Sequence, residues 1–220
     1  YPGQKCSAAS RLYVPSSMAA SFLAKLAEEA RALPMGQVTD FRNFLGAVID
    51  ESAFDSIMTY VERAKSSPDA EILAGGRGDK TEGFFIEPTL IRVRDPSFET
   101  MRVELFGPVL TAYAYDERDM AAAFRLVDST SPYGLTGAVI ARDRTAIDAA
   151  LDALADSAGN FYVNDKPTGA VVGRQPFGGA RASGTNDKAG SYLNLLRWTS
   201  PRAVKENLEP PTAWRYPYMG

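Results

Sequence analysis

Apolar positions at helical spacing dominate the first part of the chain. After Pro15 they recur every three or four residues, which predicts an amphipathic packing helix with Ser16 or Ser17 as its N-cap and its end before Pro34. The same spacing follows Asp50, a residue type that caps helices well, and it ends at a Ser-Ser-Pro sequence. The pattern therefore predicts two helices before the first clear strand.

Strand patterns follow the second helix. Runs of β-branched, aromatic and alternating residues predict strands over residues 71–74, 84–88, 89–91 and 109–115. Helices and strands then alternate, with helices predicted over residues 117–126 and 145–154 and strands over residues 135–141 and 161–164. Alternation of this kind favours βαβ crossovers. We therefore predict an α/β fold with a largely parallel sheet that is covered on both faces.

Three segments fall outside this alternation. Residues 75–78 are rich in glycine but lack the spacing of dinucleotide or phosphate loops, so we interpret them as a turn. Residues 165–190 are rich in Gly, Thr, Asn and Asp without a period, and their apolar stretches favour a functional loop over disorder. Residues 210–220 are rich in proline and aromatic residues, which is typical of a tail that packs on another surface such as a neighbouring subunit.

Composition narrows the chemistry. The 220 residues are 45% hydrophobic and 23% charged, with a net charge of −3, which excludes disordered, collagen-like and coiled-coil classes. The chain has no apolar run near the ~20 residues of a membrane span and no basic cluster, so we expect neither membrane insertion nor a nucleic-acid partner. One cysteine and no histidine exclude an internal disulfide, a Ser-His-Asp triad and His-based metal sites, and we expect no metal.

Cys6 is therefore the candidate nucleophile, and it has to act without an imidazole. Its neighbours Gly3, Ser7 and Ala8 are small, which lets backbone amides approach a bound group and suits an oxyanion site. The alternative is that a lone cysteine serves as a small buried hydrophobe.

Short blocks of the sequence resemble motifs of the aldehyde dehydrogenase superfamily, in that family's order. These blocks are residues 3–6, similar to the nucleophile motif, residues 104–109, similar to the cofactor-side motif, and residues 176–184, similar to the C-terminal loop motif. Further blocks resemble the Δ1-pyrroline-5-carboxylate (L-glutamate γ-semialdehyde) dehydrogenase branch, namely residues 161–166, 175–188 and 197–201. The resemblance extends over essentially the whole chain.

The resemblance implies a three-layer catalytic domain with a largely parallel sheet, plus a C-terminal segment of the cofactor and oligomerisation region. Residues 1–165 would form the nucleophile-bearing catalytic domain, and residues 166–220 the substrate-anchor loop, the return to the cofactor domain and an oligomerisation tail. In that family a Rossmann-like domain, a general-base Glu and an oxyanion Asn precede the nucleophile. We therefore expect the chain to be the C-terminal portion of a larger enzyme, inactive and a poor binder of NAD when isolated.

The implied reaction is the NAD-dependent oxidation of L-glutamate γ-semialdehyde to L-glutamate in proline catabolism. Cys6 would attack the aldehyde to form a thiohemiacetal, hydride would pass to the nicotinamide, and water would hydrolyse the resulting thioester. By the same resemblance, Ser7 and the backbone amides of Gly169 and Ala170 would hold the substrate carboxylate, and Phe177 would line the aldehyde tunnel.

On the cofactor side, the resemblance places Glu104 at the nicotinamide-ribose hydroxyls and Phe106 beside the nicotinamide. Each assignment has a structural alternative: Glu104 as a solvated or salt-bridged strand-end residue, Phe177 as a core aromatic, and Gly169 with Ala170 as a simple turn.

Partners and competing functions follow from the same resemblance. We expect a small-molecule substrate and assembly as a homodimer or larger homo-oligomer. We also expect a reducing compartment, which is the cytoplasm of a bacterium or the mitochondrial matrix of a eukaryote.

Two alternatives remain open. One is another aldehyde dehydrogenase, for example one that acts on succinate semialdehyde, and the other is a non-catalytic binding or assembly module with the same fold.

Overall fold

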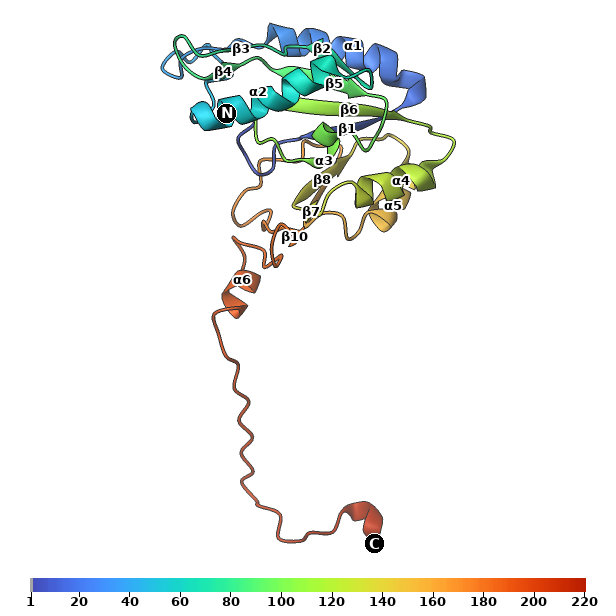
Figure 1. The fold of residues 1–220 in the computed structure, drawn as a ribbon. Coiled ribbons are helices and arrows are strands. Elements are labelled where there is room, and N and C mark those ends of the chain that lie inside the picture. Colours follow the sequence, from blue (N-terminus) through green and yellow to red (C-terminus); the bar gives the residue numbers. More distant parts are fainter. Residues whose placement is uncertain (1) are drawn as a thin grey trace.

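The largest sheet has four strands and is mostly parallel (Figure 1). The computed structural model describes residues 2–220. Strand β1 (Arg11–Pro15) pairs in parallel with β6 (Val109–Tyr115), and β6 pairs in parallel with β5 (Thr89–Val93). Strand β2 (Ala70–Ala74) runs antiparallel to β5 and completes the order β1-β6-β5-β2.

Helices cover both faces of this sheet. Alternate residues of β5 show why: Leu90 packs into one apolar cluster with Leu23, whereas Ile91 packs into a second cluster with Ile57. Leu23 belongs to α1 (Ser16–Ala32) and Ile57 to α2 (Glu51–Ser66). The sheet is therefore the middle of three layers, which confirms the predicted α/β class.

A second group of elements follows β6 along the chain. It comprises α4 (Met120–Ser129), β7 (Tyr133–Gly134), β8 (Thr136–Val139), α5 (Arg144–Ala153), β9 (Asn160–Val163) and β10 (Ala180–Arg181). Strands β8 and β9 pair in parallel and are joined through α5, so they form the βαβ crossover that the alternation predicts. Strands β7 and β10 pair antiparallel. The otherwise irregular 165–190 loop is thereby attached to this second group.

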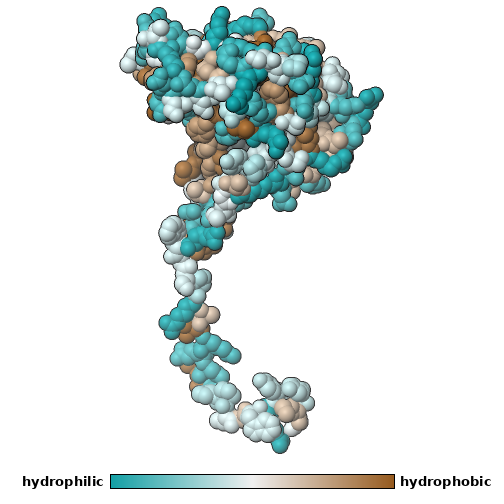
Figure 2. Space-filling model, in the orientation of Figure 1, coloured by the Kyte–Doolittle hydropathy of each residue, from teal (hydrophilic) through white to brown (hydrophobic). Residues whose placement is uncertain are grey.

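The remaining elements are short. They are β3 (Gly78–Asp79), β4 (Phe85–Ile86), α3 (Glu99–Arg102), α6 (Tyr192–Leu196) and the 3₁₀ turn Pro217–Met219. Beyond α6 the chain leaves the body as an extended arm, and every residue from Leu195 onward is exposed (Figures 1 and 2). Among residues 2–220, no helix has the length and apolar character required to cross a membrane.

The sequence-based boundaries are correct where the signals are local. The Asp50 carboxylate accepts a hydrogen bond from Ala53 N at 2.8 Å and caps α2 as predicted, and β6 spans the predicted residues. Strand β1 was not predicted from the sequence. Only Val14 of its five residues is buried, so the strand carries a weak apolar pattern. The helix predicted to begin at residue 117 begins later because Asp119 caps it, accepting from Ala122 N at 2.9 Å.

The predicted N-cap of α1 is wrong. The capping position is Pro15, and neither predicted serine caps the helix with its own side chain. Instead, Ser16 Oγ donates to Glu117 Oε2 at 2.6 Å and Ser17 N donates to Glu117 Oε1 at 3.2 Å. A carboxylate from the loop after β6 thus supplies the negative charge that favours a helix N-terminus.

This contact makes the stability of α1 dependent on pH. The hydrogen bonds from Ser16 and Ser17 lower the pKa of Glu117 from 4.5 to about 2. Because folding lowers this pKa, the contact stabilises the folded chain above about pH 4.5 and is lost as the pH falls towards 2. We expect Glu117→Gln to be less stable than the wild type at about pH 7 and to approach it in stability at about pH 2.

Urea denaturation at both pH values measures this difference. Glu206→Gln, in the exposed arm, is the matched control and should leave the unfolding midpoint unchanged at both. A Glu117→Gln defect that is equally large at acid and neutral pH would contradict the proposed origin of the effect.

Candidate active site

Cys6 lies in a tight loop just before β1. Lys5 N donates to Gly3 O and Ala8 N donates to Lys5 O, both at 2.9 Å, so the backbone turns around the cysteine. Gln4 Oε1 accepts a hydrogen bond from Ile49 N at 2.8 Å and ties the loop to the segment before α2. The cysteine itself is exposed, which excludes the alternative of a small buried hydrophobe.

A close backbone contact joins this loop to the predicted cofactor-side motif. Gly3 has φ +74°, and a Cβ there would lie 2.1 Å from Gly107 O, so only glycine fits. Gly107 in turn packs against Ile57 of α2, because a Cβ at Gly107 would lie 2.5 Å from Ile57 Cδ1. Two motifs separated by about a hundred residues are therefore in direct contact.

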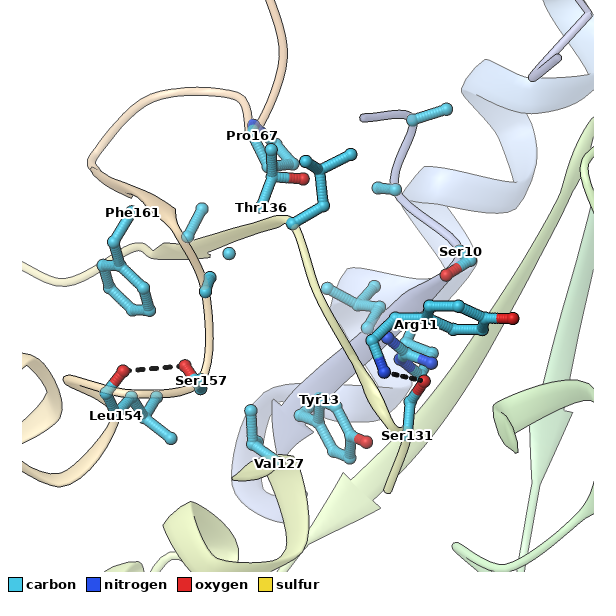
Figure 3. Close-up of a pocket in the computed structure, with 18 of the residues that line it drawn as sticks. Ser10, Arg11, Tyr13, Val127, Ser131, Thr136, Leu154, Ser157, Phe161 and Pro167 are labelled. Carbon is cyan, nitrogen blue, oxygen red and sulfur yellow. Dashed lines mark hydrogen bonds between the residues drawn. The ribbon is translucent and has the colours of Figure 1, made fainter. Parts of the chain in front are cut away.

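Cys6 and Glu104 line one large cavity, of about 560 Å³. Figure 3 shows Arg11 and Tyr13 of β1 on one side of this cavity and Thr136 of β8 on the opposite side. Among residues 2–220, each of these two strands pairs with a neighbour on one side only, and residues of both strands line the cavity. Burial raises the pKa of the Tyr13 phenol, which donates a hydrogen bond to Thr130 Oγ1 at 2.8 Å.

The two predicted cofactor residues have free side chains. Glu104 is exposed, and in the described part of the chain no protein group forms a hydrogen bond or ion pair with its carboxylate, so the salt-bridged alternative does not apply. Phe106 has φ +54°, a left-handed conformation that is uncommon for a bulky residue, and its side chain is 42% exposed. Phe106 lines a small cleft together with Glu104 and Gly107 rather than the large cavity.

A second cavity, of about 200 Å³, brings the predicted substrate residues together. Its lining includes Cys6, Ser7, Gly169, Ala170 and Phe177. Ser7 is 2% exposed, and its hydroxyl lies 2.8 Å from Thr168 Oγ1, which connects the Cys6 loop to the 165–190 loop. Gly169, directly after this contact, has φ +86°, a left-handed conformation that favours glycine.

Phe177 is held through its backbone. Phe177 N donates to Ala189 O at 2.9 Å, and Ala189 N donates to Phe177 O at 2.7 Å. On either side of the phenylalanine, Asn160 of β9 donates from Nδ2 to Pro176 O at 3.0 Å and accepts from Gly178 N at Oδ1 at 3.1 Å. The ring lines the cavity and is only half-buried, so Phe177 is not a core aromatic.

A family model described as "Aldehyde dehydrogenase family" matches residues 1–204. The chain belongs to the aldehyde dehydrogenase family. Its resemblance to that family's motifs, noted from sequence, is thus confirmed, and so is the α/β fold class.

Several relatives in this family carry the name of one enzyme. The mitochondrial delta-1-pyrroline-5-carboxylate dehydrogenase of Dictyostelium discoideum is 53% identical over 219 residues, which cover 100% of this chain and 39% of that protein. A crystal structure of the Mycobacterium tuberculosis delta-pyrroline-5-carboxylate dehydrogenase matches with a TM-score of 0.86 at 48% identity, covering 100% of this chain and 41% of that one. The same Mycobacterium tuberculosis enzyme bound with NAD matches with a TM-score of 0.84, again at 48% identity, covering 100% of this chain and 40% of that one. The chain spans about two fifths of the length of these aldehyde dehydrogenases.

The sequence patterns did not predict two residues that shape the site. Thr168 contacts Ser7, and Asn160 holds both peptide groups that flank Phe177. The only sequence signal for Asn160 was an amide residue directly before the apolar residues of β9. Nothing in the local sequence distinguishes Thr168 from an ordinary loop residue, because its partner lies 161 positions away.

We expect Asn160→Ala to lower the free energy of unfolding by about 1–3 kcal/mol, because Pro176 O and Gly178 N would both lose a partly buried partner. Urea denaturation measures the change. The matched control is Asn207→Ala in the exposed arm, where we expect a change within about 0.5 kcal/mol. A loss at Asn160 no larger than the control's would show that the amide does not hold the loop.

Proposed function

We propose that this chain is the nucleophile-bearing part of an NAD-dependent enzyme that oxidises L-glutamate γ-semialdehyde to L-glutamate, a step of proline catabolism. The observation that carries the proposal is the position of Cys6 at two cavities. One cavity holds Glu104, and the other holds Ser7 and Phe177. The thiol needs such an arrangement, because the aldehyde enters from one side and the hydride leaves the thiohemiacetal carbon towards the other. The names of the similar proteins support the same choice of substrate.

The chemistry begins at the sulfur of Cys6. As a thiolate it attacks the aldehyde carbon, which forms the C–S bond of a thiohemiacetal and moves negative charge onto the carbonyl oxygen. The backbone N–H of Cys6 is one donor for that oxygen. After hydride has left the same carbon, a thioester remains on Cys6. Water then hydrolyses the thioester, releasing glutamate and restoring the thiol.

The chain's residues fit a nicotinamide dinucleotide on the Glu104 side. A carboxylate without a protein partner, beside a cavity that also reaches Cys6, can accept both hydroxyl protons of a ribose diol. When bound, the dinucleotide supplies the hydride acceptor. The exposed ring of Phe106 offers a flat apolar surface next to Glu104.

The opposite cavity fits a short aldehyde that carries an acidic end. The hydroxyl of Ser7 and the backbone N–H groups of Gly169 and Ala170 are donors for a carboxylate. Successive peptide N–H groups beside a residue in the left-handed conformation, as Gly169 is, can bind an anion without an arginine. The ring of Phe177 packs on the methylene groups between the carboxylate and the aldehyde. We infer that these residues select the substrate, while Cys6 performs the chemistry.

Assembly and compartment form part of the proposal. The exposed arm carries Trp198, Trp214, Tyr216 and Tyr218, and large exposed apolar side chains usually mark a surface that another protein covers. We infer that a second copy of the chain covers it, which makes the enzyme a homodimer or larger homo-oligomer. In a eukaryote its compartment would be the mitochondrial matrix, which agrees with the word mitochondrial in the names of several relatives, and in a bacterium the cytoplasm.

We expect Cys6→Ala in the complete polypeptide to lower kcat/KM for L-glutamate γ-semialdehyde by about 1,000-fold or more, because no other thiol of this chain can replace the nucleophile. Ser7→Ala should lower it by about tenfold, mainly through KM, because one donor to the carboxylate is lost. Initial rates of NAD reduction measure both effects.

A substrate comparison tests the choice of aldehyde. Succinate semialdehyde lacks the amino-bearing carbon of L-glutamate γ-semialdehyde, so its carboxylate lies one carbon closer to the aldehyde. It should be the poorer substrate of the wild type. A preference for succinate semialdehyde would assign the chain to another aldehyde dehydrogenase. If Cys6 reacts with iodoacetamide no faster than a simple thiol and Cys6→Ala retains activity, the chain is instead a non-catalytic module.

A further inference from the structure

The geometry points to Thr168 as a positioning residue that orients the Ser7 hydroxyl towards the carboxylate of the substrate. This inference rests on the proposed function, because it concerns how the same site selects an acidic aldehyde. Thr168 would not touch the reacting atoms. It would act through Ser7, which lies next to the nucleophile and lines the smaller cavity.

The contact between the two hydroxyls is short and partly enclosed. Ser7 Oγ and Thr168 Oγ1 are 2.8 Å apart, a good distance for an O–H···O hydrogen bond. Ser7 is buried and Thr168 is half-buried, so water does not readily replace either partner. Among residues 2–220, neither hydroxyl has a second hydrogen-bond partner, which leaves one proton of the pair free.

The direction of this hydrogen bond decides what Ser7 presents to the cavity. If Ser7 donates to Thr168, only oxygen lone pairs of Ser7 remain for a ligand, and these repel a carboxylate. If Thr168 donates to Ser7, the Ser7 proton is free to donate to the carboxylate. An anionic substrate therefore selects the second arrangement, and the chain of hydrogen bonds from Thr168 through Ser7 to the anion is mutually strengthening.

Thr168 also joins the two groups of hydrogen-bond donors that we propose bind the substrate carboxylate. Ser7 comes from the loop before β1, whereas the N–H groups of Gly169 and Ala170 directly follow Thr168 in the sequence. The hydroxyl contact thus fixes one group of donors against the other across 161 positions of the chain. A valine at this position keeps the shape and the β-branching of threonine but cannot donate, so it separates orientation from packing.

The test uses the complete polypeptide with L-glutamate γ-semialdehyde and with propanal, an aldehyde without a carboxylate. We expect Thr168→Val to raise KM for the semialdehyde about tenfold, with kcat within about twofold, and to leave kcat/KM for propanal unchanged. Thr168→Ser keeps the donor and should restore KM to within about twofold of the wild type. In a Ser7→Ala background, Thr168→Val should have no further effect on KM, since both changes remove the same interaction.

Three results would overturn the inference. The first is an equal loss of kcat/KM with propanal in Thr168→Val, and the second is a failure of Thr168→Ser to restore KM. The third is additive effects of Thr168→Val and Ser7→Ala on KM. Each result indicates that Thr168 acts in loop packing alone. A wild-type enzyme that oxidises propanal as efficiently as the semialdehyde would contradict the proposed function itself, and with it the role of Thr168. The two failures are therefore distinguishable by the wild-type substrate ratio.

Discussion

Parallel pairing of β1 with β6 is the constraint on which the candidate site depends. In a parallel pair both strands begin at the same edge of the sheet, so the segments that precede them come together. The register places Arg11 opposite Thr111, and Thr111 N donates to Ser10 O at 3.0 Å. Cys6 precedes one strand and Glu104 precedes the other. The Cys6 loop and the 104–109 motif are therefore neighbours because of strand direction, and the Gly3 contact with Gly107 O completes their approach.

The side of the site where we propose that the substrate binds is built in a different way. Residues 165–190 contain only the two-residue strand β10, so their shape comes from individual hydrogen bonds rather than from a ladder. The Ser7 contact with Thr168 holds one end of the cavity, and the Asn160 and Ala189 contacts hold Phe177 at the other. Burial lowers the pKa of Lys188, whose ammonium donates to Gly159 O and adds a further tie. A loop held by a few separable contacts on a rigid sheet can change its specificity without changing the fold.

Unusual backbone conformations collect around the site. Phe106 and Asn164 have positive φ values without being glycine, at +54° each. Phe106 lies within the cofactor-side motif, and Asn164 directly precedes the 165–190 loop. Such conformations cost free energy and persist where the surrounding structure enforces them. For Asn164 the compensation is visible, because its Oδ1 accepts a hydrogen bond from Ala141 N at 2.9 Å. For Phe106 the conformation leaves the ring exposed next to Glu104, on the side where we propose that the dinucleotide binds.

The sequence alone determined the features that depend on neighbouring residues. Asp50 caps α2, residues 109–115 form β6, and the motif residues around Cys6 and Glu104 indicate the aldehyde dehydrogenase family, because each signal is contained in a short stretch. Only the tertiary structure decided the partners that lie far apart along the chain. Glu117 rather than a local serine supports the start of α1, β1 forms despite its weak pattern, and Thr168 meets Ser7. Local propensity acts over one or two turns of chain, whereas these contacts exist only after the sheet has set the direction and order of its strands.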